Sequence, residues 1–261
     1  MKTVRALVHV AVVVSAVLGH VHEVTGRYEG LEFLEPCPRY APDFEACLER
    51  SANMLAERFR HGLPKLGYNS PSEVEPIILD ELHINLDGGP SSYKAEFKDI
   101  TARGVSKVRV TGLRSQVTDD EVQLQLSLSI PEISADAKYN SSGKLIFVQA
   151  GGAGKYWGKY YHVRAKVFIR AKPYFSGNQK FLRLQQLKMD FQVPNIEMGV
   201  TNLPGGTKSF IQHALNVFIN SHSQELLKEM KPDLKRKLIQ VMSTFVERIF
   251  SRIPYNAFIT D

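Results

Sequence analysis

The sequence predicts an α+β fold in which a long, curved antiparallel β-sheet is followed by a long C-terminal helix. Between residues 76 and 200, apolar and polar residues alternate with a period of two, and no helical segment interrupts the alternation. After Gly205 the apolar residues recur every three or four positions, as in a helix. A helix over residues 232–253 would span about 33 Å, as would a strand of about ten residues. The sheet and the helix are therefore matched in length.

The composition is that of a folded protein. The chain has 261 residues, of which 43% are hydrophobic and 23% charged. No segment is dominated by Ser, Gln, Gly or Pro, which argues against disordered and collagen-like classes. The 33 Lys and Arg residues exceed the 27 Asp and Glu residues by six. This excess is spread along the chain, so we expect no nucleic-acid partner.

The N-terminus has the layout of a secretory signal peptide. Lys2 and Arg5 precede the apolar run Ala6–Leu18, and the small residue Gly19 follows it. This run is shorter than the roughly 20 residues needed to cross a membrane, so an uncleaved anchor is the weaker alternative. We expect a signal peptide over residues 1–19 and a single secreted domain over residues 20–261.

The two cysteines are expected to form a disulfide. Cys37 and Cys47 are ten positions apart, and a secreted protein matures in an oxidising compartment. Neither their spacing nor their surroundings favour a redox or metal-binding pair. Asp43 is placed to cap a helix that follows it. One face of that helix carries Phe44, Cys47, Leu48, Ser51, Leu55 and Phe59.

Asn140 begins the one acceptable N-glycosylation sequon, Asn140-Ser141-Ser142. The polar residues around it, followed by Gly143, predict a surface turn.

The strand pattern is clearest in two segments. Five apolar residues alternate with four polar ones over Val122–Ile130, and a similar alternation covers residues 161–170. The alternation changes parity between Leu184 and Leu187 and between Leu79 and Leu82, which predicts bulges. We expect six to eight strands, most of them 8–15 residues long, without crossover helices.

Two helical segments are predicted at the C-terminus. The first carries apolar residues from Ile211 to Leu226, and Pro232 stands where the second could begin. The pattern leaves open whether Pro232 separates two helices or bends one. A basic cluster surrounds it: Lys228, Lys231, Lys235, Arg236 and Lys237. This cluster is typical of a solvated helix face and predicts no stable membrane insertion.

Known catalytic motifs are absent from the sequence. It has no G-x-S-x-G elbow and no H-E-x-x-H pair, and a disulfide would leave no cysteine nucleophile. His213 and His222 are nine positions apart, a poor spacing for one metal ion. The sequence therefore predicts no enzyme, no metal site and no cofactor.

The order of the segments resembles the insect takeout/juvenile hormone-binding protein family. The resemblance rests on the N-terminal cysteine segment, the turn His61–Tyr68, the strand Glu75–Ile84, the segment Leu215–Pro232 and the closing Pro254-Tyr255. It covers nearly all of the chain after the signal peptide. The single cysteine pair places the chain nearer the takeout branch than the moth hemolymph hormone carriers, which have a second pair.

The resemblance implies that the sheet wraps around the C-terminal helix and encloses an apolar tunnel. The protein would be a secreted, monomeric carrier in insect hemolymph, with a juvenile hormone-like terpenoid, a fatty acid or another lipophile as ligand and a circadian or feeding-related role. Two alternatives remain: a secreted protein that contacts proteins or membranes without a ligand, and an unrecognised hydrolase. Candidate tunnel residues are Leu124, Leu126, Leu128, Val163, Val167, Ile169, Leu215, Phe218, Met242 and Phe245.

Overall fold

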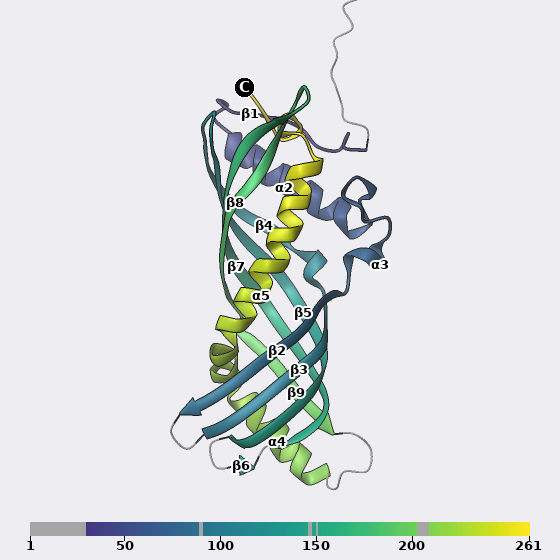
Figure 1. Ribbon diagram of the computed structural model, residues 1–261, viewed down its shortest axis with the longest axis vertical. Helices are drawn as coiled ribbons and strands as arrows, with labels where there is room; N and C mark the ends of the chain where they lie inside the picture. The colour runs from purple at the N-terminus through teal and green to yellow at the C-terminus, as the bar shows by residue number, and fades with distance from the viewer. Residues whose placement is uncertain (1–29, 89–90, 146–147, 150, 203–208) are drawn as a thin grey trace, which may run out of the picture. The chain divides into compact units, whose positions relative to one another are not determined.

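The computed structural model describes residues 30–88, 91–145, 148–149, 151–202 and 209–261. The chain divides into the units Met1–Glu32 and Phe33–Asp261, and the fold is that of the second unit. The predicted signal peptide lies outside the described residues. Figure 1 shows the elements. In chain order these are β1 (Cys37–Pro38), α2 (Phe44–Arg60), α3 (Pro71–Val74), β2 (Ile77–Gly88), β3 (Ser91–Arg103), β4 (Arg109–Val117), β5 (Val122–Leu145), β6 (Val148–Gln149), β7 (Gly152–Ser176), β8 (Gln179–Gln192), β9 (Asn195–Asn202), α4 (Ser209–Ser221), α5 (Ser223–Arg252) and β10 (Ile259–Thr260), with short 3-10 turns at Pro64–Leu66, Val105–Lys107 and Tyr255–Ala257.

The predicted disulfide is confirmed. Cys37 in β1 is bonded to Cys47 in the first turns of α2, with their Cα atoms 5.7 Å apart. Strand β1 also pairs in parallel with β10, so the same segment holds the C-terminus. Helix α2 begins after Asp43, as expected, but the Asp43 side chain makes no capping hydrogen bond. Its carboxylate instead lies 3.4 Å from Arg50 on the next turns of the helix.

Strands β5 and β7 are the central strands of an eight-stranded sheet in the described part of the chain. They have 24 and 25 residues and pair antiparallel along 19 positions from Val122 to Ser141. Each is longer than predicted, because each serves two sets of neighbours. The first half of β5 pairs with β4 and its second half with β3, while β7 pairs first with β9 and then with β8. Strand β2 extends the sheet beyond β3.

The bulge predicted in β8 is present, whereas the one predicted in β2 lies instead in the neighbouring strand β3. The register between β7 and β8 shifts between Arg170 and Ala171, opposite the segment in which the sequence changes parity. The change between Leu79 and Leu82 is accompanied by a register shift in the neighbouring strand β3, between Lys98 and Thr101. Bulges increase the local bend and twist of a sheet, and Figure 1 shows that this sheet is strongly curled.

The surface turn predicted at Asn140 is wrong, although Asn140 is exposed. It lies within β5, which continues to Leu145. Gly143 makes this continuation possible because its φ is +103° and a Cβ atom there would lie 1.8 Å from the carbonyl oxygen of Ser92. Glycine therefore allows the backbone of β3 to approach closely and does not end the strand.

Helix α5 settles the question about Pro232. The proline lies inside a continuous helix of 30 residues, and the break between helices comes earlier, at His222. A proline ring cannot donate the backbone hydrogen bond of its turn, and it bends a helix at that point without ending it. Of the two possibilities that the sequence left open, the structure has the bend, and α5 begins nine residues before Pro232.

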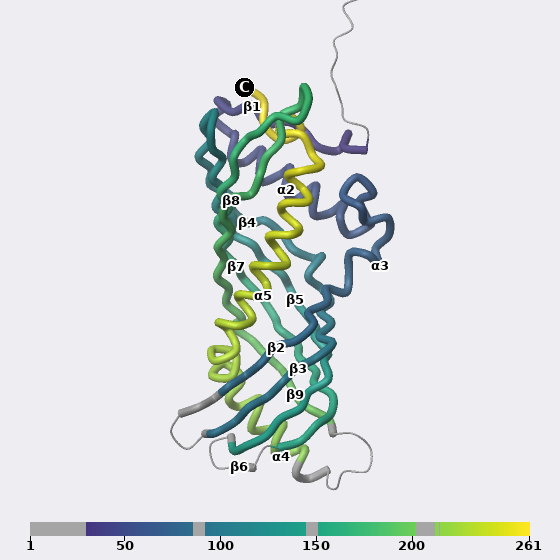
Figure 2. The backbone as a smooth tube through the Cα atoms, in the orientation of Figure 1, coloured from purple at the N-terminus to yellow at the C-terminus, as the bar shows by residue number. Residues whose placement is uncertain are grey.

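Helix α5 contacts strands at both edges of the sheet, β8 and β2. A curled sheet whose two edges reach one helix forms a half-barrel closed by that helix. Figure 2 shows the path of α5 along the length of the sheet. No helix among the described residues is both long and apolar enough to cross a membrane.

Asparagine side chains cover the backbone of two edge strands. Asn220 and Asn216, on α4, each accept from one N–H and donate to one C=O of β9, at Met198 and Val200, over 2.7–3.1 Å. Asn53 on α2 does the same at Val110 of β4, with both distances 2.9 Å. These pairs satisfy edge groups that could otherwise pair with another chain.

Candidate ligand-binding interior

The inner face of the sheet falls into two regions. In the first, formed where β5 and β7 pair with β3 and β9, the inner side chains are buried against α4 and the start of α5. We call this group the packed cluster. Its buried members are Leu79, Leu82, Ile84, Ala95, Phe97, Ile100, Ala137, Tyr139, Tyr156, Met198, Val200, Ile219, Leu226 and Met230.

Tyrosine hydroxyls are the polar groups inside this first region. Tyr156 and Tyr160 share a hydrogen bond between their hydroxyls, and Tyr156 also donates to the Met198 sulfur at 3.8 Å. Gly158, between them on the same face of β7, leaves room for both rings, because a Cβ there would lie 2.5 Å from the Tyr156 oxygen. Burial raises the pKa of Tyr160 and raises that of Tyr156 well above its ordinary range. Both hydroxyls therefore stay neutral at physiological pH.

The second region lies where β5 and β7 pair with β4 and β8. Leu124, Leu126 and Leu128 of β5, which we call the leucine row, stand directly opposite Ile169, Val167 and Ala165 of β7. Opposite residues of an antiparallel pair share a face. Val167 is 2% exposed and Ile169 6%, so this face is the inner one. The leucine row on the same face is only half-buried.

The helices explain why the leucine row keeps accessible surface. Helix α5 packs against β8 on one side of the row, and α2 packs against β4 on the other. The two helices meet where the Phe59 ring lies 4.8 Å from the Phe245 ring and 4.8 Å from the Tyr68 ring. Phe245 and Met242 on α5 are half-buried. The row therefore lies between two flanking helices, with apolar side chains on the helix that runs beside it.

Comparisons with known proteins agree with this architecture. The family model for haemolymph juvenile hormone binding protein matches residues 9–260. The chain belongs to this family. It is 25% identical to the circadian clock-controlled protein daywake of Drosophila melanogaster, over 87% of this chain and 88% of that protein. It is 21% identical to a putative beta-carotene-binding protein of Schistocerca gregaria, over 83% and 84% of the two chains.

A solved structure has the same fold as this protein. Takeout 1 of Epiphyas postvittana superimposes with a TM-score of 0.72, covering 87% of this chain and all of that one at 15% sequence identity. The resemblance to the takeout/juvenile hormone-binding protein family and the wrapped sheet that it implied are thus confirmed. The family's description is that of a binding protein.

The ten predicted tunnel residues lie in different settings. Leu124, Leu126 and Leu128 form the half-buried leucine row, and Val163, Val167 and Ile169 are buried on the adjoining strand of the same face. Met242 and Phe245 lie on the helix flanking that row. Leu215 and Phe218 on α4 lie apart from these, because they pack against the packed cluster.

The buried tyrosine pair was not predicted from the sequence. Around Tyr156 and Tyr160 the inner positions include Gly158, and on the facing strand Ala135 and Ala137 stand opposite Gly158 and Tyr156. Small residues hide the apolar alternation of this segment, since neither Gly nor Ala marks a face as strongly apolar. The signal that could have found it is the spacing Tyr-x-Gly-x-Tyr, which places two aromatic rings on one face of a strand around a gap.

Two hollows lie on the surface and are lined largely by polar residues. One, of about 300 Å³, involves Arg60, Glu75 and Arg103. The other, of about 360 Å³, involves His83, Glu96 and Asn140. Neither is lined by a predicted tunnel residue.

Proposed function

We propose that this protein is a secreted carrier that sequesters an elongated hydrophobic small molecule in a tunnel over the leucine row, between α2 and α5. The observation that carries the proposal is the accessible surface of Leu124, Leu126 and Leu128 on the inner face on which Val167 and Ile169 of β7 are buried. Apolar surface that remains accessible inside a fold is the surface that an apolar ligand can cover. The other predicted tunnel residues on β7 and α5 would extend this lining, whereas Leu215 and Phe218 lie apart from it against the packed cluster.

The chemistry of the interior favours a neutral ligand. The side chains that flank the leucine row on β7 and α5, such as Val167, Ile169 and Met242, are apolar, and the buried Tyr156 and Tyr160 hydroxyls are uncharged. A carboxylate would lose its hydration there without gaining a cationic partner. A neutral ester or hydrocarbon burying about 400 Å² of apolar surface would gain about 10 kcal/mol before the cost of immobilisation. We therefore place a terpenoid or similar lipophile ahead of an ionised fatty acid.

The family and the relatives support a ligand of this kind. The family takes its description from a haemolymph protein that binds juvenile hormone, and one relative is described as a putative carotene-binding protein. The sequence predicts a signal peptide over residues 1–19, secretion, a monomeric state and glycosylation at Asn140, and we include these four properties in the proposal. The circadian description of the Drosophila relative makes a clock-linked role a proposal here.

Titration with an apolar fluorescent probe tests the proposal. A neutral probe should bind saturably with one molecule per chain, and juvenile hormone or another neutral terpenoid should displace it more effectively than a fatty acid of similar length. Absence of saturable binding would contradict the carrier and favour a protein that contacts other proteins or membranes. Release of an acid from ester ligands during the titration would favour the hydrolase. Mass spectrometry of lipids that co-purify from the native fluid would name the ligand.

A further inference from the structure

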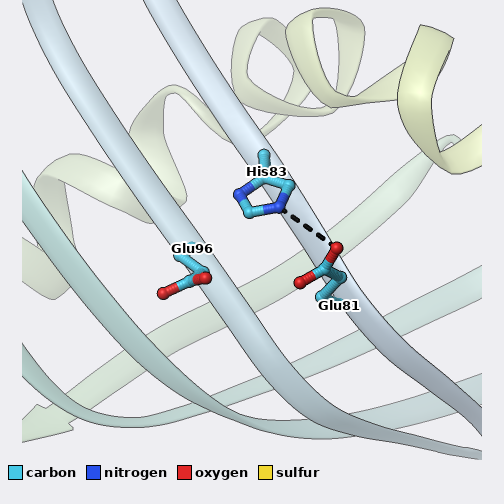
Figure 3. A group of neighbouring side chains, drawn as sticks. All are labelled: Glu81, His83 and Glu96. Atoms are coloured by element: carbon cyan, nitrogen blue, oxygen red, sulfur yellow. Dashed lines mark ion pairs between the residues drawn. The ribbon is translucent and has the colours of Figure 1, made fainter.

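A group of potential metal ligands lies on the outer face of the sheet, opposite the interior. Glu81 and His83 are two positions apart on β2, so both project from the same face. Glu96 on β3 stands directly opposite His83. Figure 3 shows the three side chains on one side of the two strands, with Glu81 and His83 on one strand and Glu96 on its neighbour.

The three side chains are already close enough to share an ion. One ligand atom from each lies within 4.8 Å of those of the other two. The His83 Nε2 and a Glu81 carboxylate oxygen are 3.6 Å apart. Two ligands of a tetrahedral Zn²⁺ ion, each about 2.0–2.2 Å from the metal, are about 3.4 Å apart. Small rotations of exposed side chains would therefore complete the geometry.

We propose that Glu81, His83 and Glu96 form a binding site for a divalent transition-metal ion, with Zn²⁺ as the ion that fits best. An imidazole nitrogen and two carboxylate oxygens are ligands that zinc accepts, whereas Ca²⁺ and Mg²⁺ prefer sets made of oxygen alone. Three protein ligands leave a fourth position for water or for another ligand. The hollow of about 360 Å³ beside His83 and Glu96 gives that position room.

Lys98 would compete with the ion for the Glu96 carboxylate. It stands opposite Glu81 across the two strands, and its ammonium lies 2.9 Å from a Glu96 carboxylate oxygen. A zinc ion must displace the ammonium from Glu96 before it can use this carboxylate. Removal of the Lys98 charge should therefore tighten zinc binding.

The proposed site is separate from the carrier function. Leu82 and Ile84 alternate with His83 on β2 and are buried in the packed cluster, so their side chains point to the opposite face. Ion binding would link β2 to β3 near the edge of the sheet without occupying the interior. The metal-site proposal can therefore fail while the carrier proposal stands, and the carrier proposal can fail while the metal-site proposal stands.

A zinc titration of the untagged, chelator-treated protein tests the proposal. Isothermal titration calorimetry should show one equivalent of Zn²⁺ bound per chain. His83→Gln and Glu96→Gln should each weaken binding about tenfold or more, because each removes one of three ligands. Lys98→Gln should strengthen it several-fold. The thermal midpoint of the wild-type protein should rise with Zn²⁺, and that of His83→Gln should not.

The chain offers a matched control for the histidine. His61 is also exposed and lies 3.8 Å from one carboxylate, that of Glu57, but no three-residue group that includes it was found among the described residues. His61→Gln should leave zinc affinity within about twofold of wild type, since it removes no ligand of the site. His20 and His22 are also close together in the sequence, so the double variant His20→Gln/His22→Gln is measured as well.

Three results would overturn the proposal. The first is the absence of saturable binding by wild type below about 1 mM Zn²⁺. The second is unchanged affinity in a folded His83→Gln protein. The third is loss of binding in the His20→Gln/His22→Gln variant while His83→Gln still binds, which would place the ion at the N-terminal segment.

Discussion

Strands β5 and β7 each cross two regions of the interior, and the two regions are covered differently. Where they pair with β3 and β9, side chains such as Phe97 and Ala137 are about 7% exposed. Where they pair with β4 and β8, the leucine row at Leu124, Leu126 and Leu128 is half-buried on the same inner face.

The difference lies in the helices and not in the strands. Helix α4 and the first turns of α5 lie over the packed cluster and contribute Ile219, Leu226 and Met230 to it. In the other region α2 and α5 pack against β4 and β8, at the two sides of the leucine row. The same two strands therefore carry buried inner side chains in one half and half-buried ones in the other.

Truncation of one large side chain in each region should give the largest contrast. Phe97 packs edge-on against Tyr156 with ring centroids 5.1 Å apart, so Phe97→Ala should lower the free energy of unfolding by about 3–5 kcal/mol. Leu126→Ala should cost less than about 2 kcal/mol, because part of that side chain is already accessible. Urea denaturation measures both, and equal losses would remove the distinction between the regions.

Substitution by a larger side chain should also distinguish the two regions. Ala137→Phe adds a ring to the packed cluster and should destabilise the protein by about 2–3 kcal/mol. Leu128→Phe adds volume beside accessible space, so its cost should stay below about 1 kcal/mol. Thermal unfolding of the two variants compares them. A large loss at Leu128 would indicate that no space lies above the row.

Loss of an asparagine contact should lower the free energy of unfolding by a similar amount in both halves. Asn220→Ala leaves the Met198 N–H and C=O of β9 without these partners, and Asn53→Ala does the same to Val110 of β4. Each change should cost about 1–2 kcal/mol. Hydrogen exchange at the Met198 and Val110 amides should speed up in the matching variant alone. Faster exchange at both sites in either variant would show that the halves unfold together.

The buried tyrosines of the packed half should make the protein slightly less stable at alkaline pH. Burial raises the pKa of Tyr156 and Tyr160 in the folded state. Their contribution to stability is therefore complete below the ordinary tyrosine pKa of about 10 and is lost as the pH rises above it toward the folded value. Tyr160→Phe should flatten the loss of stability above pH 10 that urea denaturation measures. An unchanged slope would contradict this origin.

The sequence predicted the order of elements, the disulfide and the bulge in β8, because each leaves a local mark. The parity change at Leu184–Leu187 reveals a bulge without knowledge of the partner strand, and two cysteines have one pairing. The parity change at Leu79–Leu82 marks a bulge that lies in the neighbouring strand β3. The lengths of β5 and β7 were underestimated because a strand that changes partners at its middle looks like two strands in sequence. The role of Pro232 stayed open because a proline is found both at helix starts and at bends.

The candidate site was less accessible to prediction. Alternation identified the leucine row and Val167 as members of one inner face, but the difference in their exposure depends on where α2 and α5 lie. Glu81, His83 and Glu96 were missed because Glu96 comes from another strand, and only the register between β2 and β3 places it opposite His83.

The binding of a neutral fluorescent lipophile to two tryptophan variants tests the central claim most directly. Leu126→Trp would fill the space above the leucine row, whereas Gln125→Trp places the same ring at the exposed neighbouring position on the outer face. The account predicts that Leu126→Trp weakens binding about tenfold or more while remaining folded, and that Gln125→Trp binds like wild type. Wild-type affinity in a folded Leu126→Trp protein would contradict the account.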